Sequence, residues 1–414
     1  MSLPQEFIAN TENLFGPERW QRFVQAFDEE PVTSVRLNPF KQPEKPIFPS
    51  MTPVPWCKYG YWLQERPNFT LDPLFHAGVY YVQEAGSLFL DHVVHAHVTA
   101  PVLALDLCAA PGGKSTLMRA ALPQGSVLVS NEPDRRRASI LLENMLKQGH
   151  PDVLVTHNYA HDFAKTDWMF DVILTDVPCS GEGLFRRDES AVREWSINNV
   201  QFCRNRQRQI LQDIWPCLRP GGLLIYSTCT FNTCENEENV RFIAEELGAE
   251  ILSVPVDPSW QITGSLLDGW NGPVYRFIPG TTKSEGLFMA ILRKKGESSV
   301  RALLPSSARK HAQAHALIHL LSDGIPQPEQ KGKDLIPSAA QALSINLSPA
   351  EHPRVELSLE QARRYLHRES FALPAATPKG FIVVTYKNHP LGFMKNLGDR
   401  ANNLYPKNWA IRKL

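Results

Sequence analysis

Short, continuously apolar runs alternate with helix-forming segments from residue 83 to about residue 294, and this alternation is the strongest constraint on the fold. Runs without polar alternation are typical of strands that are buried on both faces of a sheet. The predicted strands cover residues 102–107, 127–131, 153–156, 170–176, 223–227 and 287–293. The predicted helices start at Ser115 and cover 134–148, 198–218 and 235–247. We therefore expect an open, doubly wound, Rossmann-like α/β domain whose ligands bind outside the carboxyl ends of the strands.

The segments on either side of this domain have a different character. Residues 1–82 are rich in proline and aromatic residues, and we expect a small α+β segment with a helix over 17–27 and a strand over 33–37. Residues 296–370 are predicted to be a mainly helical linker, in which Ser358 and Gln361 form a capping box. Residues 371–414 contain the strand-like runs GFIVVTY and LGFMKNL and are predicted to be a β-rich module. The expected domains are 1–82, 83–295, 296–370 and 371–414.

The charge of the chain is unevenly distributed. Over 414 residues, 43 basic side chains balance 43 acidic ones. Residues 371–414 nevertheless contain seven basic residues and one acidic residue. A basic C-terminal module on a mildly acidic body indicates a polyanionic partner.

Several classes of protein are excluded by pattern. No apolar run reaches the ~18 residues of a transmembrane helix, and the first residues lack the regions of a signal peptide, so the cytoplasm is the expected compartment. The seven cysteines are scattered and include no Cys-x-x-Cys pair, which argues against a disulfide framework and a zinc ribbon. We expect a monomer with no membrane partner and no bound metal. Free thiols leave room for a catalytic cysteine.

The segment LDLCAAPGGKS (105–115) lies between a predicted strand and a predicted helix, where backbone N–H groups face a ligand. Its end matches a Walker A loop, but residue 108 is Cys where that loop needs Gly, and Gly-x-Gly-x-x-Gly is also absent. Glu132 ends the next strand, where an acidic residue binds ribose hydroxyls. A nucleoside cofactor without a pyrophosphate, such as S-adenosylmethionine, fits this combination. A structural turn beside a coincidental acid is the alternative.

Two further segments place reactive groups at strand ends, TDVPCSGEGLFRRD (175–188) and LLIYSTCTFNTCENEENV (223–240). Asp176 ends one buried strand and precedes Cys179, while Cys229 follows the next strand. Because the carboxyl ends of the strands face one crevice, we expect these groups to reach one substrate. Cys234 is a second possible nucleophile, although its position before a helix also suits a capping role.

Six motifs in order give the chain a recognisable resemblance. They are SVRLNP (34–39), DPLFHAGVYYVQEAGS (72–87), CAAPGGK (108–114), the DxPCSG segment from Asp176, the STC segment ending at Cys229 and LGFMKNLGDRANNLYP (391–406). The chain resembles the NOL1/NOP2/Sun family of RNA 5-methylcytosine methyltransferases, most closely the RsmF-type branch of 16S rRNA enzymes. The resemblance covers nearly the whole chain.

The resemblance implies a role for each site residue. Cys229 would be the nucleophile, Cys179 would assist product release, Asp176 would sit between cofactor and base, and Lys114 would organise the site. Glu132 would bind the ribose of S-adenosylmethionine, and either Asn158 or Asp162 would contact its adenine. The loop that wraps this cofactor would consist of Cys108, Ala109, Ala110, Pro111, Gly112, Gly113 and Lys114.

The chemistry of cytosine supports this division of roles independently. C5 of cytosine is a weak nucleophile, but addition of a thiolate to C6 converts the ring into an enamine-like nucleophile at C5. Hydrogen bonding or protonation at N3 by Asp176 would stabilise the charge that develops during the addition. A second thiol is useful for resolving the adduct, because the first remains covalently occupied during methyl transfer.

The RNA-binding surface is expected outside the catalytic crevice. The resemblance implies an RNA-binding N-terminal segment that contains Arg36 and Asn38, and a PUA-like C-terminal module. Arg186 and Arg187 either contact substrate phosphates or are simply solvated. In the C-terminal module, Lys387, Lys395, Arg400 and Lys407 offer charge, and Tyr386 and Tyr405 offer stacking faces, while Phe393 is expected in the core. We expect 16S rRNA or the 30S subunit as the partner, with tRNA, or a non-catalytic role in ribosome assembly, as alternatives.

Overall fold

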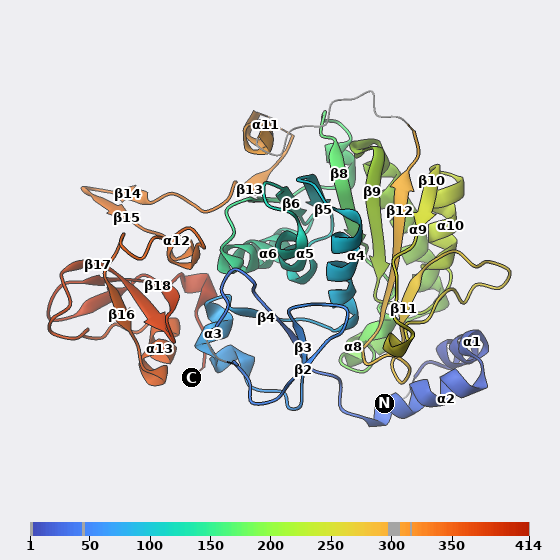
Figure 1. The fold of residues 1–414 in the computed structure, drawn as a ribbon, viewed down its shortest axis with the longest axis horizontal. Coiled ribbons are helices and arrows are strands. Elements are labelled where there is room, and N and C mark those ends of the chain that lie inside the picture. The colour runs from blue at the N-terminus through green and yellow to red at the C-terminus, as the bar shows by residue number, and fades with distance from the viewer. Residues whose placement is uncertain (1–2, 44–45, 297–306, 315–316, 414) are drawn as a thin grey trace.

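The computed structural model describes residues 3–43, 46–296, 307–314 and 317–413. Its centre is a nine-stranded sheet with the strand order β10-β12-β9-β8-β5-β6-β7-β13, with β11 paired to β12 (Figure 1). The strands are β5 (Leu103–Asp106), β6 (Val127–Asn131), β7 (Val153–Thr156), β8 (Phe170–Asp176), β9 (Leu218–Thr228), β10 (Ala249–Leu252), β11 (Tyr275–Phe277), β12 (Leu287–Lys294) and β13 (Leu320–Ser322).

The sheet is mixed, although its centre is parallel. Strands β5 to β9 run parallel, whereas β12, β10 and β13 pair with their neighbours antiparallel. The predicted doubly wound α/β fold is confirmed, but a parallel sheet describes only its five central strands. Between β10 and β12 the chain forms a short 3-10 helix (Pro258–Trp260) and β11, but not the α-helical crossover that usually joins parallel neighbours.

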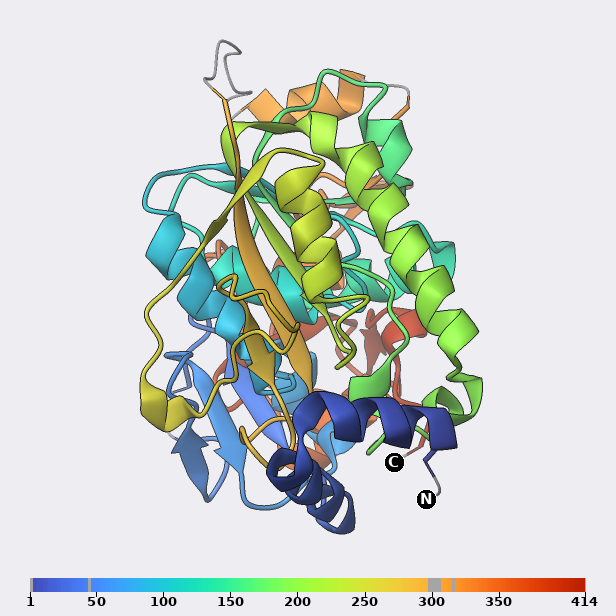
Figure 2. The ribbon, with the colours of Figure 1, turned by 90° about the vertical axis from the view of Figure 1, so that its right-hand side faces the viewer.

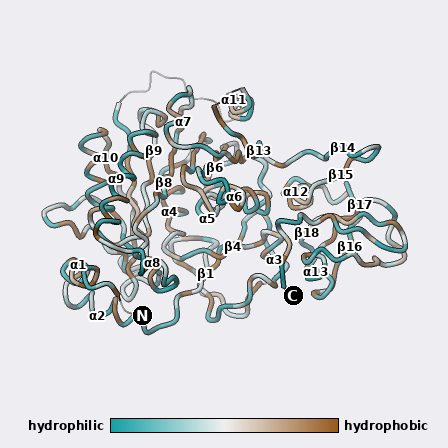
Figure 3. The backbone as a smooth tube through the Cα atoms, turned by 180° about the vertical axis from the view of Figure 1, so that it is seen from behind, coloured by the Kyte–Doolittle hydropathy of each residue, from teal (hydrophilic) through white to brown (hydrophobic). Residues whose placement is uncertain are grey.

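Helices cover both faces of this sheet, which is why its strands are apolar without alternation. Helices α4 (Phe89–His97), α5 (Gly113–Ala121) and α6 (Arg135–Gln148) bury one face, where Leu117 and Leu141 pack against Leu128. Helices α7 (Ala160–Phe163), α9 (Ile197–Ile214) and α10 (Glu237–Glu245) cover the other face (Figure 2). Apolar segments concentrate in the central strands (Figure 3). The carboxyl ends of β5, β6, β8 and β9 therefore form the one polar edge that the sequence motifs reach.

The N-terminal region contains two helices and a four-stranded sheet. The helices are α1 (Gln5–Phe15) and α2 (Pro17–Gln25), and only the second was predicted. Helix α1 buries Phe7, Thr11 and Phe15 along one face against the catalytic domain. The sheet has the order β2-β3-β1-β4. Its elements are β1 (Ser34–Leu37), β2 (Met51–Pro53), β3 (Gly60–Leu63) and β4 (Tyr80–Val82), with α3 (Pro73–His76) before β4.

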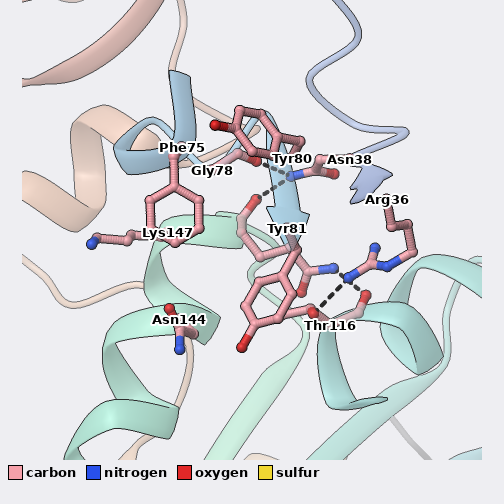
Figure 4. Close-up of a pocket in the computed structure, with 10 residues that line it drawn as sticks. Arg36, Asn38, Phe75, Gly78, Tyr80, Tyr81, Thr116, Asn144 and Lys147 are labelled. Carbon is pink, nitrogen blue, oxygen red and sulfur yellow. Dashed lines mark hydrogen bonds between the residues drawn. The ribbon is translucent and has the colours of Figure 1, made fainter. Parts of the chain in front are cut away.

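Arg36 and Asn38, which belong to the N-terminal segment, attach its sheet to the catalytic domain. Both side chains are buried. Arg36 donates hydrogen bonds to Thr116 Oγ1 at 2.7 Å and to Gln83 Oε1 at 3.1 Å. Asn38 Nδ2 donates to the carbonyl oxygens of Gly78 and Gln148 (Figure 4). Their polar groups are therefore used within the protein.

The prediction of a mainly helical linker over 296–370 is wrong for the described residues. Residues 297–306 and 315–316 lie outside the described part of the chain. The remaining residues form both helices and strands. One of these strands, β13, pairs with β7 and so extends the central sheet. The elements are α11 (Ala308–Ala314), β13, β14 (Glu329–Lys331), β15 (Asp334–Ile336), α12 (Ala339–Leu343), β16 (Arg354–Glu356) and α13 (Leu359–Leu366). The capping box of Ser358 and Gln361 at the start of α13 is confirmed.

A second four-stranded sheet forms the C-terminal module, with the order β16-β17-β18-β19. It comprises β17 (Gly380–Tyr386), β18 (His389–Asn396) and β19 (Ala401–Asn403) in addition to β16, so it starts before residue 371. Phe393 is in its core as expected, but Tyr405 is buried too and is not a stacking face. The module shares one hydrophobic cluster with the N-terminal sheet, in which Tyr365 and Trp409 join Val35 and Leu74.

Candidate active site

The loop between β5 and α5 is held open by its neighbours. Asn131 accepts the Ala109 N–H at its carbonyl oxygen (2.8 Å), and the Ala110–Pro111 peptide bond is cis. Arg137 donates to the Ala110 carbonyl oxygen at 3.0 Å. Gly112 has φ +112°, a backbone conformation that side-chain-bearing residues rarely adopt. The loop is thus fixed from both ends.

Three carboxylates surround this loop. Asp106 is fully buried, and burial raises its pKa to about 7 even though Ser115 donates to one of its oxygens. The other oxygen, Oδ1, is buried and has no hydrogen-bond partner. Glu132 accepts the N–H of Asp134 at 3.1 Å and is nearly fully buried. Burial, then the negative charges of Asp106, Glu132 and Asp176, raise the pKa of the Cys108 thiol, which shows that the three acids converge here.

Asp176 is held by two donors at the end of β8. Lys114 Nζ donates to its Oδ2 at 2.8 Å, and Ser227 Oγ donates to its Oδ1 at 2.7 Å. Burial alone would lower the pKa of Lys114, but the ion pair with Asp176 outweighs it and raises that pKa. Lys114 therefore stays positively charged at neutral pH.

The structure brings Cys179 and Cys229 together. Their Sγ atoms are 3.1 Å apart, and the Cys229 N–H donates to Cys179 Sγ at 3.4 Å. The hydrogen bond with Cys229 and burial raise the pKa of the Cys179 thiol well above its usual value. Cys179 is therefore a protonated thiol at neutral pH. It lies within hydrogen-bonding distance of Cys229 Sγ.

Cys234 lies outside this cluster. It lines a separate cavity of about 440 Å³ between α1 and the start of α9, where Gln201 Nε2 donates to its Sγ at 3.9 Å. The N-cap of α10 is Asn236, so Cys234 does not cap that helix. Burial raises the pKa of the Cys234 thiol, which makes it a weak nucleophile at neutral pH.

The two candidates for the adenine contact both have structural tasks. The side-chain amide of Asn158 donates to the Leu317 carbonyl oxygen at 2.8 Å and accepts the His319 N–H at 3.1 Å, which anchors the segment that enters β13. Asp162 accepts the Tyr159 N–H at the start of α7. The adenine contact therefore stays a prediction for either residue.

Arg186 and Arg187 hold the N-terminal segment rather than projecting freely. Arg186 forms a buried ion pair with Glu285 at 2.8 Å and donates to the Glu29 carbonyl oxygen. Arg187 donates to the Val32 carbonyl oxygen at 2.7 Å. Arg186 is therefore neither solvated nor free to contact a phosphate, because its side chain is used within the protein.

Sequence reasoning missed Ser227 and Arg137. Ser227 is opposite Asp176 in the register of β8 and β9, and it directly precedes the Thr-Cys pair of the third motif. The alignment of the two strand ends in the sequence could have indicated that Ser227 lies beside Asp176. Arg137 is three residues from the N-cap Asp134 on α6, and nothing in the sequence shows that it reaches back to the loop at Ala110.

The charges around the β5–α5 loop distinguish between the possible cofactors. The one lysine of the loop is neutralised by Asp176, while Asp106 Oδ1 lacks a donor. Such a crevice repels phosphates and accommodates a positively charged nucleoside, and S-adenosylmethionine carries both an ammonium and a sulfonium group. No group of three or more His, Cys, Asp or Glu side chains among the described residues could hold a metal ion. The fold and the site define a methyltransferase that depends on S-adenosylmethionine.

Three family models match the chain in sequence order. They describe the N-terminal domain of 16S rRNA methyltransferase RsmF (residues 3–85), 16S rRNA methyltransferase RsmB/F (98–293) and the methyltransferase RsmF PUA domain (352–411). The chain belongs to the RsmB/F family of 16S rRNA methyltransferases and has the N-terminal and PUA domains of the RsmF type. The resemblance found in the sequence motifs is confirmed.

Curated relatives match over nearly their full length. Ribosomal RNA small subunit methyltransferase F from Shigella flexneri serotype 5b (strain 8401) is 30% identical over 435 residues, covering 90% of this chain and 89% of that protein. The protein of the same name from Escherichia coli O139:H28 (strain E24377A / ETEC) is 29% identical with the same coverage.

Solved structures share the fold. NSun6 from Pyrococcus horikoshii, solved with SFG, has a TM-score of 0.60 at 20% identity and covers 71% of this chain and 99% of that one. A methyltransferase homologue from Pyrococcus horikoshii has a TM-score of 0.57 at 23% identity and covers 70% of this chain and 100% of that one. In the described part of the chain, no helix is long and apolar enough to cross a membrane.

Proposed function

We propose that this chain methylates C5 of a cytosine in 16S rRNA, with a transient covalent bond between Cys229 and C6 of the base. The observation that carries the proposal is the pair of thiols 3.1 Å apart at the ends of adjacent strands, beside the ion pair of Lys114 and Asp176. The curated relatives described above are named as small-subunit ribosomal RNA methyltransferases, and that name favours 16S rRNA as the substrate.

The residues around the β5–α5 loop fit S-adenosylmethionine. Small residues from Cys108 to Gly113 let the backbone approach the cofactor closely, Glu132 would bind the ribose hydroxyls, and the unpaired oxygen of Asp106 suits the ammonium group. When bound, the cofactor supplies a methyl group activated as a sulfonium. The protein must then make C5 of the cytosine nucleophilic and hold it beside this methyl group.

Cys229 makes C5 nucleophilic by adding to C6 of the base. Its thiolate forms a bond to C6, and the C5–C6 electron pair shifts to make C5 an enamine-like nucleophile. Lys114 stays positively charged at neutral pH and lies close enough to Cys229 for the two groups to interact electrostatically. Asp176 would accept a hydrogen bond from the exocyclic amine or share a proton with N3 as charge builds there. Ser227 and Lys114 hold the carboxylate in place for this contact.

Cys179 would act when the product leaves. After methyl transfer, water takes the proton from C5, the C5–H electron pair restores the C5–C6 double bond, and the C6–sulfur bond breaks with its electron pair remaining on Cys229. The protonated Cys179 thiol can donate a hydrogen bond to the departing thiolate at the 3.1 Å separation seen here. The target base must leave its stack to enter the site, at a cost of a few kcal/mol. The basic C-terminal module would supply part of that energy through phosphate contacts.

Transfer of labelled methyl groups from S-adenosylmethionine tests the proposal. Purified 16S rRNA, 30S subunits and bulk tRNA are compared as substrates, with wild-type protein and Cys229→Ala. We expect 5-methylcytosine in a small-subunit sample with the wild type and none with the variant. Label in tRNA alone would contradict the rRNA assignment. Cofactor binding without label in any RNA would contradict catalysis and favour a role in ribosome assembly.

A further inference from the structure

Two buried glutamates cross-link the loops that carry the two thiols. Glu182 follows Cys179 by three residues, and its Oε2 accepts the N–H groups of Phe231 and Asn232, at 2.6 and 3.0 Å, on the loop of Cys229. Glu235 follows Cys229 by six residues, and its Oε2 accepts the Ser180 N–H, at 3.0 Å, on the loop of Cys179. Each loop thus supplies the carboxylate that holds the other.

Neutral side chains complete this arrangement. Asn232 Nδ2 donates to Glu182 Oε1 at 3.0 Å and to Glu235 Oε1 at 2.9 Å, so one amide bridges both carboxylates. Gln207 on α9 donates to Glu235 Oε2 at 2.6 Å and to the Pro178 carbonyl oxygen at 2.9 Å. Trp195 Nε1 donates to Glu182 Oε1 at 2.9 Å.

The arrangement is costly to build, which argues that it has a purpose. Glu182 and Glu235 are both almost fully buried, and the hydrogen bonds described above to their carboxylates all come from neutral backbone or side-chain groups. Burial, and then the negative charge of Glu182, raise the pKa of Glu235 to about 7. An apolar contact between the loops would avoid this desolvation, but it would not fix their positions as hydrogen bonds do.

We propose that Glu182 and Glu235 are positioning residues, which hold Cys179 and Cys229 in register by reciprocal hydrogen bonds between their loops. This inference rests on the proposed function, because it assigns the register to adduct formation and release. Neither glutamate takes part in the bond changes. A displacement of about 1 Å in a reacting group lowers rates by about 100-fold, so small movements of these loops are sufficient to matter.

Single-turnover methylation of the active RNA substrate tests the inference with Glu182→Gln and Glu235→Gln. Glutamine keeps the shape, but its N–H₂ group faces N–H donors in either orientation, because both oxygens of each glutamate accept from such donors. We expect the chemical rate to fall about 100-fold in each variant, while the Kd of S-adenosylmethionine and the KM of the RNA change less than about threefold. Glu238→Gln is the matched control, because Glu238 lies three residues from Glu235 but is partly exposed and pairs with Arg204. The control should retain the wild-type rate.

The double variant separates positioning from simple loss of stability. Because both glutamates hold one pair of loops, the double change should lower the rate little more than either single change, whereas independent defects multiply. If the glutamine variants do not fold, Asn232→Ala leaves both carboxylates in place but removes the amide that bridges them and accepts the Glu235 N–H, and it should lower the rate in the same way.

The outcomes distinguish the two proposals. An inactive wild type overturns the proposed function before the variants are compared. An active wild type with glutamine variants as fast as Glu238→Gln, or with multiplying defects in the double variant, overturns the positioning role alone.

Discussion

Ser227 Oγ donates a hydrogen bond to Asp176 Oδ1 at 2.7 Å, across two parallel strands that place these residues in register. The second oxygen of Asp176 accepts from Lys114, so the carboxylate is fixed from two sides. A carboxylate held in this way can meet a base edge without reorganising, which is how polar sites favour charge development.

Ser227→Ala should therefore slow methyl transfer without unfolding the protein. The substitution removes one neutral hydrogen bond to a carboxylate, and we expect a roughly tenfold lower rate of the chemical step, corresponding to about 1.4 kcal/mol. Single-turnover kinetics with saturating cofactor measure this rate. Ser139→Ala, at an exposed serine of α6, is the control and should behave as wild type. An unchanged rate in Ser227→Ala would remove Ser227 from the site.

Asp106 should make the cofactor-free protein less stable as the pH rises. Its pKa is about 7 in the folded protein and about 3.9 in an unfolded chain, so the folded state binds more protons between these values. The free energy of unfolding therefore falls from about pH 4 to pH 7. Above pH 7, Asp106 causes no further change in this free energy. Asp106→Asn should remove this part of the slope. Urea unfolding of both proteins between pH 5 and pH 8 measures it, and parallel curves would contradict the burial argument.

Arg186→Ala should destabilise the fold rather than weaken RNA binding. The change leaves the buried Glu285 carboxylate without its partner Arg186, and breaking a buried ion pair costs roughly 3–5 kcal/mol. Urea unfolding measures the loss. Arg193→Ala is the control, because its pair with Glu189 is exposed. If the folded Arg186→Ala protein keeps full stability but loses RNA affinity, the phosphate-contact hypothesis returns.

The exposed basic residues of the C-terminal module should determine RNA affinity. Lys387, Arg400 and Lys407 are exposed, and replacing all three with Ala should weaken RNA binding and reduce its salt dependence. Filter binding between 50 and 200 mM salt measures both quantities. The single-turnover rate at saturating RNA should not change, because these side chains lie outside the crevice. Wild-type affinity in the triple variant would place RNA binding elsewhere.

Local patterns in the sequence were sufficient for the centre of the fold and the ends of its strands. The predicted strands at 127–131, 153–156 and 170–176 match β6, β7 and β8, because continuous apolar runs are buried wherever they occur. The positions of Asp176, Cys179 and Cys229 follow from those strand ends. The structure also places the latter two thiols in contact.

Long-range pairing explains what the sequence could not show. Strand β13 forms because it pairs with β7 and because Asn158 holds the segment before it, contacts that span about 160 residues. The sequence does not show that Arg36 and Arg186 are buried, because a charged side chain in a motif gives no sign of its burial. The reciprocal bonds of Glu182 and Glu235 became visible only when the two loops were placed side by side.

The most direct test of the central claim is to trap the covalent intermediate. Cys179→Ala is incubated with S-adenosylmethionine and the active RNA substrate, and the products are separated on a denaturing gel, with mass spectrometry to locate the linked residue. The account predicts a stable protein–RNA adduct at Cys229, because addition proceeds but release is slow, and no adduct in Cys179→Ala/Cys229→Ala. An adduct at Cys234, or 5-methylcytosine formed by Cys229→Ala, would contradict it.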